Sequence, residues 1–171
     1  TPRRGGGRRY LGAGLIGAGL AIAVGFAQMA ANPRAGRTGR RCTSNLKQIG
    51  LAFILYQQKH DELLPDRNGT AFVSRLYELK LLQDKNVYLC PLGTQTPAEG
   101  PVLDAETCSY IGRRNLDHPL TSTLIAKFGS RTVLAADRAV DHHGDSRRVL
   151  FADGHVEEVP EESYQRLWAG A

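Results

Sequence analysis

This chain has 171 residues and a formal net charge of +5, and its basic residues are concentrated at one end. Residues 1–60 contain ten Lys or Arg and no acidic residue, whereas residues 61–171 contain 12 basic and 17 acidic side chains. Because the first arginines flank an apolar run and no aromatic side chains alternate with them, we expect no nucleic-acid binding. A chain of this length accommodates one domain once an apolar anchor is set aside.

The first predicted element is a hydrophobic helix in residues 1–31, which would act as an anchor or stalk. Residues 11–27 contain no polar side chain, and the run extended to residue 31 approaches the roughly 20 residues that span a bilayer. Four arginines precede it, so the positive-inside rule keeps the N-terminus cytoplasmic and the body on the far side. Small residues at four-residue spacing form a stripe that lets another helix approach closely: Ala13, Gly17, Ala21 and Gly25.

Two fates of this hydrophobic segment remain open. If Arg8-Arg9 begins a twin-arginine style export signal, cleavage near Ala30 and Ala31 would release a soluble protein. If the helix is retained, it is a stalk for assembly. Its Gly and Ala content accordingly either provides a packing face or only dilutes the hydrophobicity of a signal peptide.

Helices are expected on both sides of residue 65. Residues 32–41 contain Pro and Gly, so we expect a flexible or extended neck there rather than a helix. Apolar residues at intervals of three and four then predict an amphipathic helix from residue 42 to about residue 60. Its apolar face contains Leu46, Ile49, Phe53 and Tyr56, and is widened by Leu51, Ile54 and Leu55. A second, shorter helix is expected through Phe72, Leu76, Leu79 and Leu82.

Beyond residue 86 the pattern changes to short β-like runs, at residues 87–89, 109–111, 132–136, 149–152 and 155–159. Asp153-Gly154, between the last two runs, predicts a two-residue hairpin turn with positive φ at both positions. Pro160 and the two glutamates after it are typical of the first turn of a terminal helix, which would end near Trp168. The predicted fold class is α+β, with a head domain over residues 42–171.

Two segments about a hundred residues apart carry a family resemblance. The first is CTSNLKQIGLAFILYQQKHDELLP, residues 42–65, and the second is HGDSRRVLFADGHV, residues 143–156. In the second, nine residues separate His143 from Asp153-Gly154. This combination resembles the prepilin-like proteins with a His-x9-Asp-Gly C-terminal domain, relatives of type IV pilins and of the major pseudopilins of type II secretion. The resemblance implies a hydrophobic stalk followed by a pilin-like head, in which the amphipathic helix packs on a small antiparallel sheet.

The resemblance also implies a function. The chain would be a structural subunit, held in the inner membrane with its head in the periplasm, that polymerises through its N-terminal helix into a periplasmic or extracellular filament of identical copies. In this interpretation the residues that join stalk to head are Leu46, Ile49 and Phe53, and those that organise the C-terminal hairpin are His143, Asp153 and Gly154. The main alternative is a monomeric exported or membrane-anchored binding module, since the apolar run lacks the Glu that pilins carry there.

The three cysteines allow one loop-closing bridge. Cys90 and Cys108 flank an irregular loop rich in Pro and Gly, so in an exported protein a disulfide between them would contribute roughly 3 kcal/mol. The alternative is a pair of reduced, buried cysteines, and Cys42 is left over in either case. Because there is no Cys-x-x-Cys, a zinc ribbon and a thioredoxin-like redox site are not supported.

A cluster of acids and histidines lies just before the hairpin. A divalent cation could be held there by Asp141, His142, His143 and Asp145. Oxygen ligands would suit calcium, which the pseudopilin resemblance also implies, whereas a histidine with an acid would suit zinc. The interpretation that we favour has no cofactor: His143 and Asp153 would hydrogen-bond the loop backbone and set the hairpin register.

Catalytic motifs are missing from the sequence. It contains no Gly-x-Ser-x-Gly, no phosphate-binding loop, no His-Glu-x-x-His and no dinucleotide fingerprint. We therefore expect that the protein is not an enzyme. A metal-dependent periplasmic enzyme built on the histidine loop is the third hypothesis, after the filament subunit and the binding module.

Overall fold

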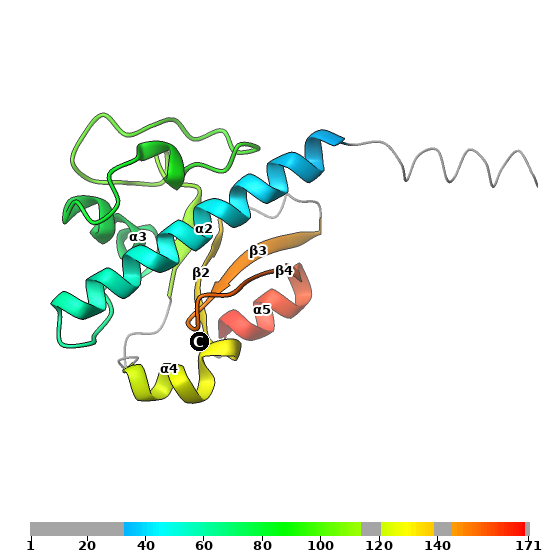
Figure 1. Ribbon diagram of the computed structural model, residues 1–171. Helices are drawn as coiled ribbons and strands as arrows, with labels where there is room; N and C mark the ends of the chain where they lie inside the picture. The colour runs from blue at the N-terminus through cyan, green and yellow to red at the C-terminus, as the bar shows by residue number, and fades with distance from the viewer. Residues whose placement is uncertain (1–32, 114–120, 139–144, 170–171) are drawn as a thin grey trace, which may run out of the picture. The chain divides into compact units, whose positions relative to one another are not determined.

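The structure, a computed structural model, describes residues 33–113, 121–138 and 145–169. The chain divides into two units, Thr1–Pro33 and Arg34–Ala171, and the second contains nearly all the described residues (Figure 1). The hydrophobic helix predicted for residues 1–31 lies outside them. Among the residues that the structure describes, no helix is both long and apolar enough to cross a membrane.

The second unit is built on a four-stranded antiparallel sheet. The strand order follows the chain, β1-β2-β3-β4, so each strand pairs with the next. The strands are β1 (Tyr110–Gly112), β2 (Val133–Asp137), β3 (Ser146–Phe151) and β4 (Val156–Pro160). Together with the helices, this sheet confirms the predicted α+β class.

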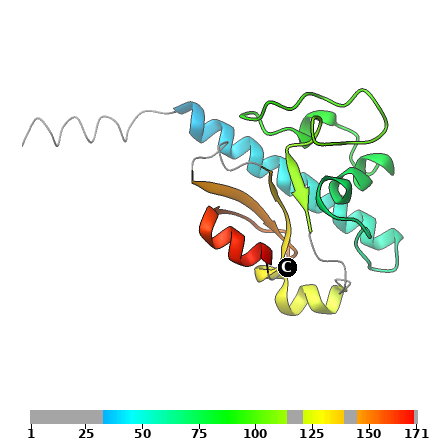
Figure 2. The ribbon, with the colours of Figure 1, turned by 180° about the vertical axis from the view of Figure 1, so that it is seen from behind.

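Helices lie on both sides of this sheet (Figures 1 and 2). The long helix α2 (Pro33–Lys59) runs across one face, and the terminal helix α5 (Glu161–Ala169) packs on the other. The intervening elements are α3 (Gly69–Glu78), the 3-10 helix η1 (Lys85–Tyr88), α4 (Ser122–Phe128) and the 3-10 helix η2 (Gly129–Arg131). The amphipathic helix therefore packs on a small antiparallel sheet, as predicted.

Apolar side chains fill the space on each side of the sheet. Successive residues of a strand point to opposite faces, and β3 uses this alternation. Leu150 belongs to the cluster that contains the inner side chains of α2, whereas Val149 and Phe151 belong to the cluster that contains Tyr164 of α5. Because both faces are covered, β3 is apolar at consecutive positions.

The start of α2 corrects one prediction. The neck expected over residues 32–41 is helical from Pro33 onward. A proline suits the first turn of a helix, because an N–H at that position has no intrahelical acceptor. Farther along, Gly39 is buried, and a Cβ atom on it would lie 2.8 Å from Arg148 Nη2, so a side chain of β3 covers the helix there. This tertiary contact offsets the low helix propensity of glycine, which the sequence-based prediction could not take into account.

Two further elements differ from prediction. Residues 87–89, expected to form a strand, overlap the 3-10 helix η1 instead. The carboxylate of Asp84 caps this helix by accepting a hydrogen bond of 2.9 Å from the backbone N–H of Asn86. The short helix α4 was not predicted, although Thr121 provides its N-terminal cap.

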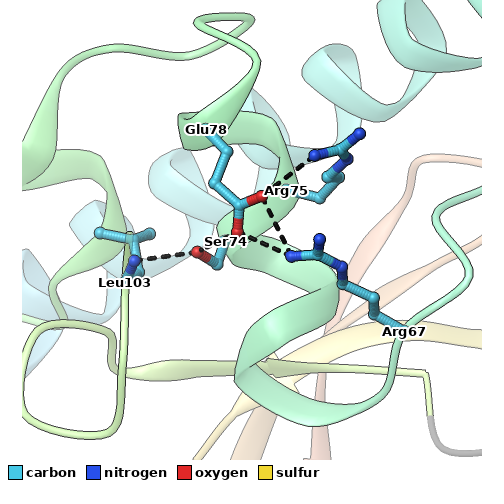
Figure 3. A network of polar contacts seen from close by, with 5 residues as sticks. All are labelled: Arg67, Ser74, Arg75, Glu78 and Leu103. Atoms are coloured by element: carbon cyan, nitrogen blue, oxygen red, sulfur yellow. Dashed lines mark hydrogen bonds and ion pairs between the residues drawn. The ribbon is translucent and has the colours of Figure 1, made fainter. Parts of the chain in front are cut away.

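An ionic network joins α3 to the loop that follows η1 (Figure 3). The carboxylate of Glu78 accepts hydrogen bonds from Arg67, at 2.8 and 3.0 Å, and from Arg75, at 3.1 Å. Ser74 Oγ donates to Glu78 at 3.1 Å and accepts from the backbone N–H of Leu103 at 2.9 Å. Burial raises the pKa of Glu78, but the hydrogen bonds from Arg75 and Ser74 and the charge of Arg67 lower it by more. The net shift of this pKa is therefore downward.

Candidate functional site

The helix α2 carries apolar side chains on two sides. On its inner side Leu46, Ile49 and Phe53 are at most 1% exposed and belong to the core of the head. These residues were expected to join the stalk to the head, and the structure places them in packing within the head rather than on an exposed contact surface. They therefore position the helix and do not offer a surface to a partner.

On the outer side of α2 three large apolar side chains face solvent. Leu51, Ile54 and Leu55 have exposed fractions of 62%, 49% and 45%. Residues three and four apart are neighbours on a helix, so these side chains form one patch, which we call the outer stripe. The sequence pattern places them on the widened apolar face of the helix, and the structure shows that this part of the face is exposed. The signal in the sequence that could have indicated an exposed apolar patch is that this part of the helix is apolar around most of its circumference.

Close packing sets which side of α2 faces outward. A Cβ atom on Gly50 would lie 3.1 Å from Leu150 Cδ1, so the helix backbone approaches β3 closely at this glycine. Three residues later, the ring of Phe53 packs on that of Phe72, with centroids 4.6 Å apart. With Gly50 and Phe53 held against the sheet and α3, rotation of the helix to bury Leu51 would break both contacts.

The hairpin between β3 and β4 contains the Asp-Gly half of the sequence motif. The backbone N–H of Phe151 donates to the carbonyl of His155 at 2.9 Å, and that of Gly154 donates to the carbonyl of Phe151, also at 2.9 Å. Gly154 has a φ of 90°, in the region that favours glycine, whereas Asp153 is not among the residues with positive φ. The connection is thus a three-residue loop over residues 152–154, and the predicted two-residue turn with positive φ at both positions is wrong.

Asp153 orders this loop through His155. Its Oδ1 accepts a hydrogen bond of 3.1 Å from the backbone N–H of His155 and lies 2.6 Å from His155 Nδ1. The imidazole also stacks on the ring of Phe151, with centroids 4.3 Å apart. Burial raises the pKa of Asp153, but the hydrogen bonds from His155 outweigh it, so the pKa is lowered. His143 lies outside the described residues, and its proposed role in hairpin register stays a prediction.

The other predicted site residues fall mostly outside the described part of the chain. The small-residue stripe, Ala13, Gly17, Ala21 and Gly25, lies there entirely, as do three of the four candidate metal ligands, Asp141, His142 and His143. Asp145 is described and exposed, and its backbone carbonyl accepts a hydrogen bond of 2.9 Å from the N–H of Glu161. The calcium hypothesis therefore stays a prediction.

The cysteines are arranged differently from the prediction. Cys42 Sγ lies 2.7 Å from Cys90 Sγ, whereas the thiol of Cys108 donates to the backbone carbonyl of Tyr110 at 3.3 Å. Burial raises the pKa of Cys108 to about 12. The structure places Cys42, and not Cys108, beside Cys90, because α2 brings Cys42 to the segment that follows η1, so the geometry does not support the predicted Cys90–Cys108 bridge.

Comparisons with protein families, with curated proteins and with solved structures find no match for this chain. The prepilin resemblance thus depends on the two sequence segments that carry it. The geometry adds two independent features, the outer stripe on α2 and the turn organised by Asp153. Of these, the outer stripe is the one that suggests an interaction.

Proposed function

We propose that this protein is a structural subunit of a pilin-like or pseudopilin-like filament, and that the outer stripe of α2 contributes to the contact between subunits. The observation that carries the proposal is the exposure of Leu51, Ile54 and Leu55 on one face of the helix nearest in sequence to the hydrophobic segment. Adjacent exposed apolar side chains are typical of interaction surfaces, whereas single ones are common everywhere. Burial of such side chains contributes roughly 25 cal/mol per Å².

In the proposed filament the two apolar surfaces have different partners. The hydrophobic segment, residues 1–31, would pack against the same segment of other subunits through its stripe of small residues, first in the inner membrane and then in the filament core. The outer stripe would be covered by the head of a neighbouring copy. A contact that repeats from copy to copy without closing into a ring produces an open helical assembly.

The first experiment is electron microscopy of the full chain purified from a bacterial host, with mass spectrometry of its N-terminus. We expect filaments whose subunits retain residues 1–31. Dispersed particles that begin near Asn32 would contradict the proposal and favour the exported binding module. Dispersed particles that keep the hydrophobic segment would favour the membrane-anchored one.

The outer stripe has its own test in the double variant Leu51→Gln/Ile54→Gln. Removing the apolar contacts of two side chains is expected to reduce assembly by at least about tenfold, since 1.4 kcal/mol is a factor of ten. The matched control is Leu124→Gln, which changes a leucine that is 37% exposed on another helix, α4. Circular dichroism should show a folded head in the unaltered protein, the double variant and the control. Normal assembly of the double variant would exclude the stripe from the subunit contact.

The small-residue stripe is tested separately with Gly17→Leu. A leucine at this position would hold neighbouring helices apart and is expected to block assembly while the head stays folded. Gly100→Leu serves as a control, because nothing lies within 4 Å of a Cβ atom at this exposed glycine. Filaments from the Gly17 variant would contradict packing through this stripe.

A further inference from the structure

We propose that Cys42 and Cys90 form a buried disulfide bond that ties α2 to the segment after η1. Their Sγ atoms lie 2.7 Å apart, well inside ordinary contact distance for sulfur, and the two residues are 0% and 3% exposed. A disulfide of about 2.0 Å therefore needs only a small approach of the two side chains. This bond would form whether or not the protein assembles into filaments.

Neighbouring contacts hold the two cysteines close together. Asn45 lies nearly one helical turn after Cys42 and so faces the same side of α2. Its Nδ2 donates to the backbone carbonyl of Leu89, the residue before Cys90, at 2.9 Å, and to the hydroxyl of Tyr110 at 3.4 Å. The approach of Cys42 to Cys90 is thus part of a wider contact between the helix and this segment.

A metal site is the competing explanation for this cluster. Cys42, Cys90 and Asp137 are all buried, and one potential ligand atom from each lies within 4.8 Å of the others. Two thiolates bound to one tetrahedral zinc at 2.3 Å would be roughly 3.8 Å apart, so a separation of 2.7 Å is too short for both to be ligands. In addition, the third potential ligand is already used in the protein, because Oδ2 of Asp137 accepts a hydrogen bond of 3.0 Å from the backbone N–H of Arg148. The geometry therefore favours a sulfur–sulfur bond.

The oxidation needs an electron acceptor, for which we name a small-molecule disulfide such as oxidised glutathione. One protein thiolate attacks a sulfur of glutathione disulfide and releases one glutathione thiolate. The second protein thiolate then attacks the mixed disulfide and releases the other. Two protein thiols become one disulfide, two protons leave the protein, and the two electrons reduce one glutathione disulfide to two glutathione molecules.

The bond should form while the chain folds, before the core closes. In the folded, reduced protein the hydrogen bond with Cys90 and burial raise the pKa of Cys42 well above its ordinary value, and the charge of Asp137 adds to this. Since the thiolate is the reactive form, the folded dithiol would react slowly. Burial similarly shields the finished disulfide from reductants.

Peptide mapping of the full chain distinguishes the possible pairings. The protein is unfolded and reduced in denaturant, refolded with oxidised and reduced glutathione in a mild detergent, alkylated and digested without reduction. Cleavage after Lys, Arg and Glu separates the cysteines into residues 42–47, 86–99 and 107–113. We expect a disulfide-linked pair of peptides 42–47 and 86–99. A link to 107–113, or a folded protein with three alkylated cysteines, would overturn the proposal.

Variants connect the bond to stability. Addition of reductant during refolding is expected to lower the melting temperature by about 10 °C, because the bond closes a long loop. Cys108→Ser should keep both the linked peptides and this shift, whereas Cys42→Ala should lose both. A reductant-dependent shift that survives in Cys42→Ala but not in Cys108→Ser would assign the bond to another pair. The mapping of the unaltered chain stays decisive if a variant does not fold.

Two measurements test the remaining steps. The protein folded under reductant should be oxidised by glutathione disulfide at least about tenfold more slowly than the refolding chain, because its thiols are buried. An equal rate would contradict the requirement for an open core. Reduced protein should also take up no stoichiometric zinc in elemental analysis. One bound zinc per chain that disappears in both Cys42→Ala and Cys90→Ala would replace the disulfide with a metal site.

Discussion

Gly112 of β1 lies directly against the ring of Phe72 of α3: a Cβ atom on this glycine would lie 2.1 Å from Phe72 Cδ1. Both residues are buried, and an isolated backbone bridge between Gly69 and Gly112 brings the start of α3 to the same strand. Phe72 in turn packs on Phe53 of α2. The missing side chain at residue 112 thus allows α3 to reach the edge of the sheet and complete the core beneath α2.

The variant Gly112→Ala should therefore be strongly destabilised. Its methyl group must displace the ring of Phe72, and we expect the free energy of unfolding to fall by about 3 kcal/mol in urea titrations. The control is Gly100→Ala, where nothing lies within 4 Å of the added methyl group. Equal stabilities of the two variants would show that α3 does not approach the strand this closely.

The two sides of α2 should respond differently to truncation. Phe53→Ala removes a ring that is 1% exposed, and we expect the free energy of unfolding to fall by about 3–5 kcal/mol. Leu51→Ala changes a side chain that is 62% exposed, and its effect should stay within about 0.5 kcal/mol. These values apply to head unfolding in detergent solution, without assembly. A large loss for Leu51→Ala would mean that this side chain is not on the outside.

Glu78 should make the protein sensitive to acid. Its pKa is lower in the folded protein than in the unfolded chain, so its contribution to stability is complete above the unfolded value and is lost as pH falls through the folded value. Denaturant titrations at decreasing pH should show this loss. In Glu78→Gln the acid-dependent part of the loss should be smaller, and stability at neutral pH should fall by about 1–2 kcal/mol.

A matched glutamate serves as the control for the pH experiment. Glu99 is exposed in the loop that follows η1, so Glu99→Gln controls for the removal of a surface carboxylate. The same slope in the Glu78 and Glu99 variants would indicate that the network of Figure 3 does not hold Glu78 ionised.

Arg147 of β3 connects the sheet to α5. Its Nε and Nη2 donate to the two carboxylate oxygens of Glu161 at 2.6 and 2.9 Å, and its Nη1 donates to the backbone carbonyls of Asp137 and Arg138. The guanidinium also lies over the ring of Tyr164, 4.6 Å from its centroid. Only a planar fork of donors makes all these contacts together.

Replacement of this arginine by lysine should therefore be costly although the charge is kept. For Arg147→Lys we expect the free energy of unfolding to fall by about 1–3 kcal/mol, because several charge-assisted hydrogen bonds are lost. Arg166→Lys is the control, since Arg166 pairs with Glu162 in an exposed i,i+4 contact. Such pairs contribute little, and we expect a change below about 0.5 kcal/mol by thermal or urea unfolding. Similar losses in both variants would contradict the bidentate contact.

Local sequence patterns were sufficient to predict much of the secondary structure of the head. The spacing of Leu46, Ile49 and Phe53 predicts the helix that the structure contains, because apolar side chains at this period line one face. Asp153-Gly154 located the last hairpin, although only the glycine has positive φ. These predictions succeeded because each depends on residues that are close in the chain.

Features that depend on distant contacts were mispredicted. Gly39 is tolerated in α2 because Arg148 of β3 covers it, and Leu51 is exposed because Gly50, its neighbour, is the residue that approaches the sheet. Likewise, Cys42 lies beside Cys90 because α2 passes the end of η1, a relationship across 48 positions that no local spacing encodes. Sequence periodicity specifies how wide the apolar surface of a helix is, whereas the part of that surface left for a partner follows from how the helix packs on the rest of the chain.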